Sequence, residues 1–267
     1  MSEVSAAELF AGTGEHYVRH RVAYPPELIA PVVEATRCLA PGRVVDIGSG
    51  PGTVALALAE CGVRVVAVDA ACEMLGWGRR LAAERGVGGV EWVVANAERL
   101  ALRRGAGLVG ATIGDAFHWM DRAAVLRGLD SLLSPRGAFV AVLSRRAPGA
   151  PRPAWHAAVR VVRDRYLAGH GAAVARGYGR RLREGHEVVL RRSAFAVVTE
   201  VTAVYAVAYT LDEVVGRQLS KAFSSRAVLG ERRTVFEADM RESLLALEPS
   251  GRFRDVTSAQ LLLARRG

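Results

Sequence analysis

The chain has 267 residues, of which 51% are hydrophobic and 24% are charged, a balance that suits a soluble globular protein. No apolar segment is long enough to be a signal peptide or a membrane span, so we expect a cytoplasmic protein with no membrane partner.

The formal net charge of +9 comes from scattered arginines, and Lys221 is the only lysine. Scattered charge is typical of a solvated surface, so we do not expect a groove that follows nucleic acid. The three cysteines, Cys38, Cys61 and Cys72, form no C-x-x-C pair, which predicts reduced thiols.

Short apolar strands alternate with helices through the first 145 residues. Strands are predicted at 44–47, 64–68, 91–95, 108–113 and 138–143, and helices at 26–38, 54–61, 71–85 and 122–133. This alternation predicts a parallel sheet that helices cover on both faces. Right-handed crossovers then favour a doubly wound, mostly parallel α/β fold of the Rossmann-like type.

The alternation is interrupted after residue 144. Residues 145–190 contain several prolines and glycines around short helical patterns, which we interpret as an inserted helical cap. A β-rich run at 195–209, helices at 211–219 and 232–247, and a strand at 259–264 follow. We therefore expect one domain over 1–267, with lid helices at 1–40, a core at 41–144, the cap at 145–190, and the rest of the core and lid at 191–267.

A glycine-rich turn follows the first predicted strand. Asp46 is followed by Gly48, Gly50 and Gly52, and a helical pattern begins at Thr53. A turn without side chains lets a ligand lie against the backbone and the N-terminus of the helix. A dinucleotide-binding loop, G-x-G-x-x-G, would require glycine at position 53, so the pattern argues against a nicotinamide cofactor.

Polar residues follow the later strands as well. Asp69 comes after the second strand, Asn96 and Ala97 after the third, and Gly114 and Asp115 after the fourth. Ligands of open α/β sheets bind beyond the carboxyl ends of the strands. A carboxylate at position 69 can accept hydrogen bonds from both hydroxyls of a ribose, although an acid in this place can also simply cap a helix.

Three segments give the chain a resemblance to a known family. They are residues 17–25 (YVRHRVAYP), 46–52 (DIGSGPG) and 116–121 (AFHWMD). With them the chain resembles the class I methyltransferases that depend on S-adenosylmethionine (SAM), within the small-molecule group that has a His-Trp pair after the fourth strand. The resemblance implies SAM as the cofactor and S-adenosylhomocysteine as its product.

The resemblance also implies the parts that single residues take. Arg21 and Tyr24 would lie near the methionine carboxylate, Asp69 near the ribose, and Asn96 near adenine, where the family usually has aspartate. The full set expected to bind the cofactor is Tyr17, Arg21, Tyr24, Asp46, Gly48, Ser49, Gly50, Gly52, Asp69, Ala70, Met74, Asn96, Ala97, Gly114 and Phe117.

Phe117, His118 and Trp119 would face the substrate by the same resemblance. A hydroxyl acceptor needs a base during methyl transfer, whereas an amine needs only to be neutral. His118 is the candidate base because the pKa of histidine suits neutral pH, and Asp115 can orient it or hold a substrate cation. The alternative is that His118 and Trp119 only pack and cap the next helix.

Other histidines are weaker candidates. His16 and His20 are spaced to share a metal on a helix, but no third ligand is apparent, so we expect a cofactor lid and no metal site. His156, His170 and His186 lie in the predicted cap and are candidates for substrate contact.

The expected function is transfer of a methyl group from SAM to an oxygen or nitrogen of a small molecule. The arginine-rich, lysine-poor composition suggests bacterial secondary metabolism, and we expect a monomer or homodimer. A nucleic-acid methyltransferase is the alternative, although residues 114–117 (GDAF) lack the prolines of the segment that grips a flipped base. A SAM-binding protein that catalyses another reaction also remains open.

Overall fold

The computed structural model describes residues 8, 10–39, 41–100, 102–103, 105–135, 138–145, 152–166 and 184–266. These residues fall into two compact units. Unit 1 lies within 1–22, 148–180 and 204–258, and unit 2 lies within 23–147, 181–203 and 259–267. The single domain expected from the sequence stays a prediction. Much of the expected cap, including His170, lies outside the described residues.

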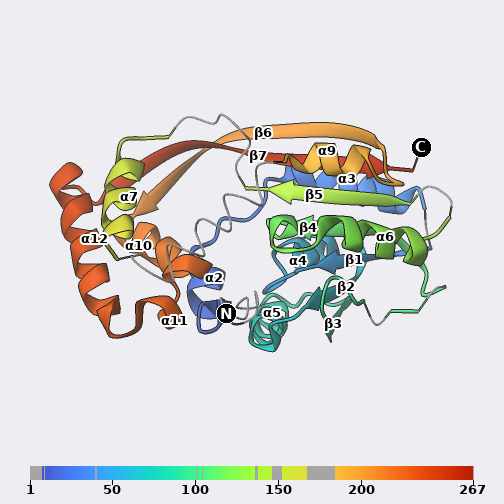
Figure 1. Cartoon of the computed structure of the whole chain (residues 1–267), viewed down its shortest axis with the longest axis horizontal. Coiled ribbons are helices and arrows are strands. Elements are labelled where there is room, and N and C mark those ends of the chain that lie inside the picture. The colour runs from blue at the N-terminus through green and yellow to red at the C-terminus, as the bar shows by residue number, and fades with distance from the viewer. Residues whose placement is uncertain are drawn as a thin grey trace. The chain divides into compact units, whose positions relative to one another are not determined.

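A seven-stranded sheet has the order β3-β2-β1-β4-β5-β7-β6 (Figure 1). Its strands are β1 Arg43–Ile47, β2 Arg64–Asp69, β3 Val90–Val94, β4 Leu108–Gly114, β5 Phe139–Ser144, β6 Val197–Thr210 and β7 Arg252–Arg265. The first five pair in parallel, and β7 runs antiparallel to β5. This arrangement confirms the predicted doubly wound, mostly parallel fold. Strands β6 and β7 contribute residues to both units.

Helices cover both faces of the sheet in unit 2. They are α3 Pro26–Arg37, α4 Thr53–Glu60, α5 Cys72–Arg85, α6 Arg122–Leu132 and α9 His186–Arg191. Side chains alternate along β1, so Val45 and Ile47 join the core cluster that contains Leu129 of α6 and Leu190 of α9. Asp46 points to the opposite face, where its carboxylate meets the N-terminus of α4. Figure 1 shows α6 in front of the sheet and α4 behind it.

Unit 1 is largely helical. It contains α2 Gly14–His20, α7 Trp155–Tyr166, α10 Leu211–Leu219, α11 Arg226–Leu229 and α12 Arg233–Leu247, with 3-10 turns at Ala222–Ser224 and Gly230–Arg232. Its core includes Trp155, Phe236, Met240 and Phe253. A capping box between Thr210 and Glu213 begins α10, which explains why its start was predictable.

The predicted strands and helices of unit 2 agree with the structure to within one or two residues. The last strand is the main difference, because β7 begins at Arg252 and the prediction began at 259. Its first residues alternate between exposed Arg252 and Arg254 and buried Phe253 and Asp255. The carboxyl of Asp255 is buried and pairs with His156. This polar residue at an inward position interrupts the alternation of apolar and polar residues from which the start of a strand is predicted. In the described part of the chain no helix has the length and apolar character to span a membrane.

Candidate functional site

The carboxyl ends of β1 to β5 lie at one edge of the sheet in unit 2, because these strands pair in parallel. The loops that follow them carry the glycine turn, Asn96, Asp115 and Arg145, and Asp69 is the last residue of β2. Sequence segments up to 100 residues apart are thus brought to the edge where ligands of such sheets bind.

The glycine loop between β1 and α4 has a left-handed backbone at three places. The φ angles of Gly48, Gly50 and Gly52 are 64°, 55° and 80°, a region that side chains with a Cβ enter only at a cost. The loop is held from within, since the Ser49 amide donates to the Val68 carbonyl at 3.0 Å and the Gly52 amide donates to the Ser49 carbonyl at 2.9 Å. Backbone hydrogen bonds within the protein therefore hold the turn in this conformation.

Asp69 fastens this loop to the end of β2. Its Oδ2 accepts a hydrogen bond from the Gly50 amide at 2.8 Å, and its Oδ1 accepts one from the Ala71 amide at 2.8 Å. Burial raises the pKa of this carboxyl, while the backbone hydrogen bonds oppose that rise. Each carboxylate oxygen has a second lone pair. Asp69 can therefore hold the loop and still accept hydrogen bonds from the two hydroxyls of a ribose.

The loop has free space for a ligand at Gly50. A Cβ added to Gly50 would meet no atom within 4 Å, whereas one added to Gly52 would lie 2.6 Å from Cη2 of Trp92. At Gly48 it would lie 2.7 Å from the Met120 side chain and 2.8 Å from Cβ of Ala116. The loop is thus packed on both sides of Gly50 and open at Gly50 itself, as a cradle for the adenosyl group requires.

The two glycines give a matched pair of variants. We expect Gly50→Ala to weaken SAM binding by roughly tenfold or more, equivalent to ~1.4 kcal/mol, with a small loss of stability from the left-handed backbone. Gly52→Ala carries the same backbone cost and also forces Trp92 aside, so it should lower the melting temperature further. Isothermal titration and thermal unfolding measure the two effects. Undiminished SAM binding by Gly50→Ala would show that the open face is not the binding face.

Asp46 lies inside the fold, with 1% of its surface exposed. Its Oδ1 accepts from the Thr112 hydroxyl on β4 at 2.8 Å, and its Oδ2 accepts from the Ala55 amide at the start of α4 at 3.2 Å. Asp46 therefore links β1, β4 and α4 beneath the glycine loop, and we propose that it acts on the cofactor by fixing the loop. Burial raises the pKa of Asp46 to about 7.

This raised pKa predicts a pH dependence of stability. The unfolded carboxyl ionises near pH 3.8 and the folded one near 7, so the stability present below pH 4 is lost as the pH rises through 7. The loss is of the order of a few kcal/mol at 1.36 kcal/mol per pKa unit. Urea unfolding of the wild type and Asp46→Asn between pH 4 and 8 isolates the contribution. The difference in unfolding free energy should vary over this range, and a constant difference would contradict the assignment.

The end of β4 has a second unusual backbone. Asp115 is the only non-glycine residue with positive φ in the described part of the chain, at 53°. Its amide donates to the Leu143 carbonyl at 2.8 Å, and its Oδ2 lies 3.7 Å from Nε of Arg145. The Arg145 guanidinium lies 4.8 Å from the centre of the Tyr24 ring. A carboxylate, a guanidinium and an aromatic ring therefore lie close together at the ends of β4 and β5.

Arg145 is a residue that the sequence reasoning missed. The sequence analysis treated it only as one of the scattered arginines, yet it follows β5 directly, as Asp115 follows β4. The rule that pointed to Asp69 and Asp115 would have found it. Tyr24, by contrast, was expected near the site, and its hydroxyl lies 3.5 Å from the position of a Cβ on Gly114.

The segment after β4 forms the 3-10 turn Phe117–Trp119. His118 is 4% exposed, and its ring centre lies 5.2 Å from that of Trp119. The cap of α6 is Asp121, whose Oδ1 accepts from the Ala124 amide at 2.9 Å. His118 therefore does not cap α6. Of the alternative interpretation, in which His118 and Trp119 only pack and cap the next helix, packing is what remains for His118.

His186 joins this group from α9. Its ring lies nearly parallel to that of His118, with centres 6.3 Å apart and planes at 16°, and its centre is 5.3 Å from that of Phe117. The sequence placed His186 among weak candidates for substrate contact. The structure places it directly beside the predicted base, although the two are 68 positions apart in the chain.

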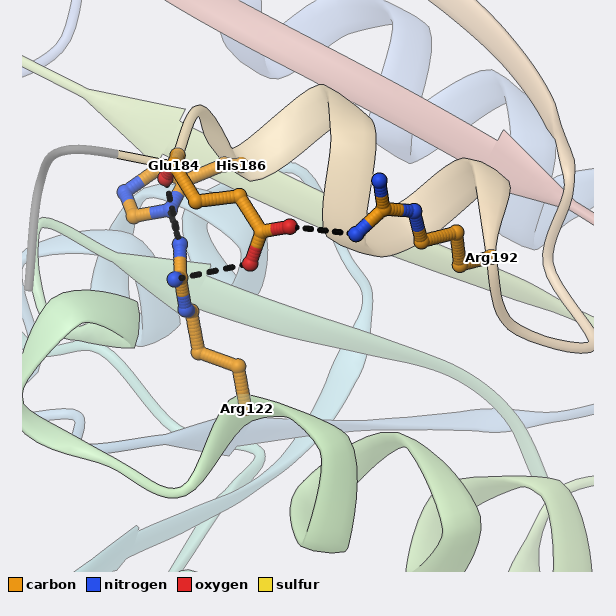
Figure 2. A network of polar contacts seen from close by, with 4 residues as sticks. All are labelled: Arg122, Glu184, His186 and Arg192. Carbon is orange, nitrogen blue, oxygen red and sulfur yellow. Dashed lines mark hydrogen bonds and ion pairs between the residues drawn. The ribbon is translucent and has the colours of Figure 1, made fainter.

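A polar network holds His186 in place (Figure 2). Nη1 of Arg122 donates to the Glu184 carbonyl at 2.8 Å and lies 3.3 Å from Nδ1 of His186. The Glu184 carboxylate pairs with Arg122 at 3.5 Å and with Arg192 at 2.6 Å. A guanidinium can only donate hydrogen bonds, so Nδ1 of His186 accepts and its proton resides on Nε2.

Burial lowers the pKa of His186 to about 4, and the charges of His118 and Arg122 act in the same direction. Asp115 acts the other way, as a carboxylate near an imidazole does. His186 is therefore a neutral ring at physiological pH that presents one N–H on the side away from Arg122 (Figure 2).

Residues after β3 form a third part of the edge. Oδ1 of exposed Asn96 accepts from the Glu98 amide at 2.8 Å, and Oε1 of Glu98 accepts from the Asp121 amide at 2.9 Å. Ala97 is partly buried between them. Glu98, which was not predicted as a site residue, ties the loop after β3 to the turn after β4.

The remaining predicted residues divide by location. Met74 and Phe117 are 3% and 1% exposed and belong to the core, so they support the loops from behind. Ala70 is exposed after Asp69. Tyr17 and Arg21 belong to unit 1, where the Arg21 guanidinium lies 4.9 Å from the Tyr17 ring centre. The contact of each with a cofactor stays a prediction.

The histidines of unit 1 that the structure describes are engaged within the protein. Nε2 of His16 lies 3.0 Å from Nη2 of Arg233, and Nε2 of His156 lies 2.9 Å from the Asp255 carboxylate. His20 packs against Gly216. Among the described residues, no three histidine, cysteine or acidic side chains are grouped as a metal site.

Comparisons with known proteins bear directly on this edge of the sheet. Residues 44–137 match the family model described as "Methyltransferase domain". The matched region runs from β1 through α6 and contains the glycine loop, Asp69, Asn96, Asp115 and His118.

Curated relatives are methyltransferases by name. An uncharacterized methyltransferase of Mycobacterium tuberculosis is 33% identical over 130 residues, which cover 49% of each chain. A ubiquinone biosynthesis O-methyltransferase of Xanthomonas campestris pv. campestris is 33% identical over 118 residues, which cover 43% of this chain and 49% of that protein. The chain thus matches about half the length of these relatives.

Solved structures share the fold over most of the chain. The YcgJ protein of Bacillus subtilis aligns with a TM-score of 0.54 at 17% identity, covering 91% of this chain and 99% of that one. A proposed type II methyltransferase from Anaeromyxobacter dehalogenans aligns with a TM-score of 0.57 at 24% identity, covering 92% and 96%. At these identities the likeness concerns the fold, which is the Rossmann-like α/β fold described above.

Proposed function

We propose that the protein is a SAM-dependent methyltransferase that transfers a methyl group to an oxygen or nitrogen of a small molecule. The observation that carries the proposal is the glycine loop that Asp69 fastens and that is open at Gly50. The match of residues 44–137 to a methyltransferase domain supports it. So does the fold shared with solved structures.

The cofactor would be held along the edge of unit 2. Gly48, Gly50 and the N-terminus of α4 would face its charged and polar groups, and the Asp69 carboxylate would accept from the ribose hydroxyls. Asn96 and Ala97 would border the adenine. Bound SAM supplies a methyl group that its sulfonium already activates, so the chain has to place the acceptor in line and exclude water.

We propose that His118 accepts the proton of a hydroxyl acceptor as transfer proceeds. The neighbouring ring of His186 would stay neutral during this step. A positively charged imidazolium in its place would oppose the protonation of His118. The Nε2–H of His186 can donate to an oxygen of the acceptor. Asp115 and Arg145 would shape the other side of the acceptor site.

The proposal also covers the class of acceptor, the location and oligomeric state of the protein, and its metabolic setting. We propose that the acceptor is a small molecule rather than nucleic acid, because residues 114–117 (GDAF) lack the prolines that grip a flipped base. We further propose a cytoplasmic monomer or homodimer of bacterial secondary metabolism. The arginine-rich composition with a single lysine supports this setting by association.

A transfer assay with tritium-labelled SAM tests the reaction class. The protein is incubated separately with bulk RNA, with DNA and with a set of phenols, alcohols and amines. Label in the small molecules alone agrees with the proposal, and label in RNA or DNA would show a nucleic-acid methyltransferase. SAM binding without transfer to any class would favour a SAM-binding protein with another reaction.

A further inference from the structure

His186 connects the His-Trp segment after β4 with the polar network of Figure 2. Its ring centre lies 5.3 Å from that of Phe117 and 6.3 Å from that of His118. Its Nδ1 atom lies 3.3 Å from Nη1 of Arg122. All four residues belong to unit 2, so these contacts lie within one compact unit.

Arg122 is itself held by the residues that lead into α9. Its Nη1 donates to the Glu184 carbonyl at 2.8 Å, and its Nη2 lies 3.5 Å from the Glu184 carboxylate. The side chain of Arg122 is only 14% exposed, so water and salt screen this pair less than a surface pair. Two contacts with one residue orient the guanidinium, which therefore meets Nδ1 of His186 with a donor.

The contact with Arg122 decides which nitrogen of His186 carries the proton. A guanidinium has only donors, so Nδ1 accepts and the proton of the neutral ring lies on Nε2. Burial lowers the pKa of His186 to about 4, and the charges of His118 and Arg122 act in the same direction. The Asp115 carboxylate opposes them. At neutral pH the ring is therefore uncharged and has one donor, its Nε2–H.

This Nε2–H has no acceptor in the described part of the chain. The contact with Arg122 is the only polar contact of the ring among the described residues, and Nε2 points away from Arg122 (Figure 2). The side chain of His186 is partly exposed. Polar groups inside a folded protein nearly always have a partner, so a bound molecule or water has to supply it.

The charges around His186 are balanced. Arg122 has the carboxylate of Glu184 at 3.5 Å. Asp115, which acts on His186, has Nε of Arg145 at 3.7 Å. Each cation of this group therefore has a carboxylate beside it, and His186 adds no charge. An anion gains little from such surroundings and loses its hydration, whereas an uncharged oxygen needs only the N–H.

We propose that His186 determines the specificity of the acceptor site and that Arg122 is the positioning residue that fixes its donor. The acceptor is a hydroxyl compound with a second, uncharged oxygen, such as an ether or carbonyl oxygen, beside the reacting hydroxyl. His118 receives the proton of the hydroxyl, and the Nε2–H of His186 donates to the second oxygen. This class of acceptor rests on the proposed function, whereas the role of Arg122 stands without it.

NMR of the histidine rings tests the role of Arg122 on the full chain, without SAM or acceptor. The chain has six histidines, and labelling them with 15N shows which ring nitrogens carry a proton. We expect His186, identified by the signals that His186→Phe lacks, to be the neutral Nε2–H form at neutral pH. A mixture of the two neutral forms, or a charged ring, would overturn the assignment.

Matched variants of α6 show whether Arg122 is the cause. Arg122→Met keeps a long side chain but removes the donors, so the ring of His186 should divide between its two neutral forms. Arg127→Met removes the same charge from an exposed position of the same helix and should leave the His186 signals unchanged. Wild-type signals in Arg122→Met would remove Arg122 from the positioning role. The wild-type spectrum decides the protonated nitrogen even if Arg122→Met does not fold.

Three phenols with tritium-labelled SAM test the class of acceptor. Beside the hydroxyl, ortho-methoxyphenol has an uncharged oxygen, ortho-ethylphenol has none, and ortho-hydroxybenzoate has a carboxylate. The wild type should show kcat/KM about tenfold higher for the methoxy than for the ethyl compound, the effect of one hydrogen bond. His186→Phe should bring these two values together by lowering the first. A wild type that treats the two alike, or that prefers ortho-hydroxybenzoate, would contradict this class of acceptor.

The two experiments separate this inference from the proposed function. A wild-type protein with the Nε2–H form of His186 that binds neither SAM nor S-adenosylhomocysteine would refute the proposed function and leave the role of Arg122 standing. Methyl transfer to phenols without discrimination between the methoxy and ethyl compounds would agree with the proposed function and refute the class of acceptor.

Discussion

Replacement of His118 by alanine should lower kcat for a hydroxyl acceptor by about a hundredfold or more, the usual contribution of a positioned base. The affinity for SAM should stay near that of the wild type, because His118 is not among the residues expected to bind the cofactor. Turnover is measured with the acceptor that the tritium assay identifies, and affinity is measured by isothermal titration.

A second substitution separates proton transfer from packing. His118→Phe keeps an aromatic ring against Trp119 and His186 but cannot accept a proton. It should be as inactive as His118→Ala on a hydroxyl acceptor. If His118→Phe restores turnover, His118 is a packing residue and the base lies elsewhere.

Replacement of Asp69 by alanine should weaken SAM binding by about 1–3 kcal/mol, since hydrogen bonds to a charged acceptor are lost. The effect has two sources, because the same carboxylate holds the Gly50 amide and would accept from the ribose. Isothermal titration at a pH well above the raised pKa of Asp69 gives the value.

Asp69→Asn serves as the matched control. It retains the shape of the side chain and one carbonyl oxygen, but it loses the charge and one of the two acceptors. Its affinity should fall between those of the wild type and the alanine variant. An alanine variant that folds and binds SAM normally would remove Asp69 from the cofactor site.

Much of unit 2 was predictable because local signals and the fold agree there. Pro26 begins α3, Gly86 ends α5 with a left-handed φ of 65°, and apolar runs mark the five parallel strands. The order of these elements then placed Asp69 and Asp115 at one edge by the general rule for open sheets. The sequence was sufficient for this part because the place of each of these residues follows from the strand that it ends or follows.

The pairing of side chains across the chain was not predictable. Arg122 and His186 meet although 64 positions separate them, and Asp115 meets Arg145 from a neighbouring strand. No local pattern encodes such contacts, since they depend on where α9 and β5 pack. The same holds for Asp255, whose polar side chain is buried beside His156 and obscured the start of β7.

The central claim is that the open glycine loop binds an adenosyl sulfonium compound or its product. Isothermal titration of the purified protein with S-adenosylhomocysteine and, separately, with NADH tests it most directly. We predict saturable binding of S-adenosylhomocysteine that Asp69→Ala weakens, and no binding of NADH. Tight binding of NADH together with no binding of S-adenosylhomocysteine would contradict the account.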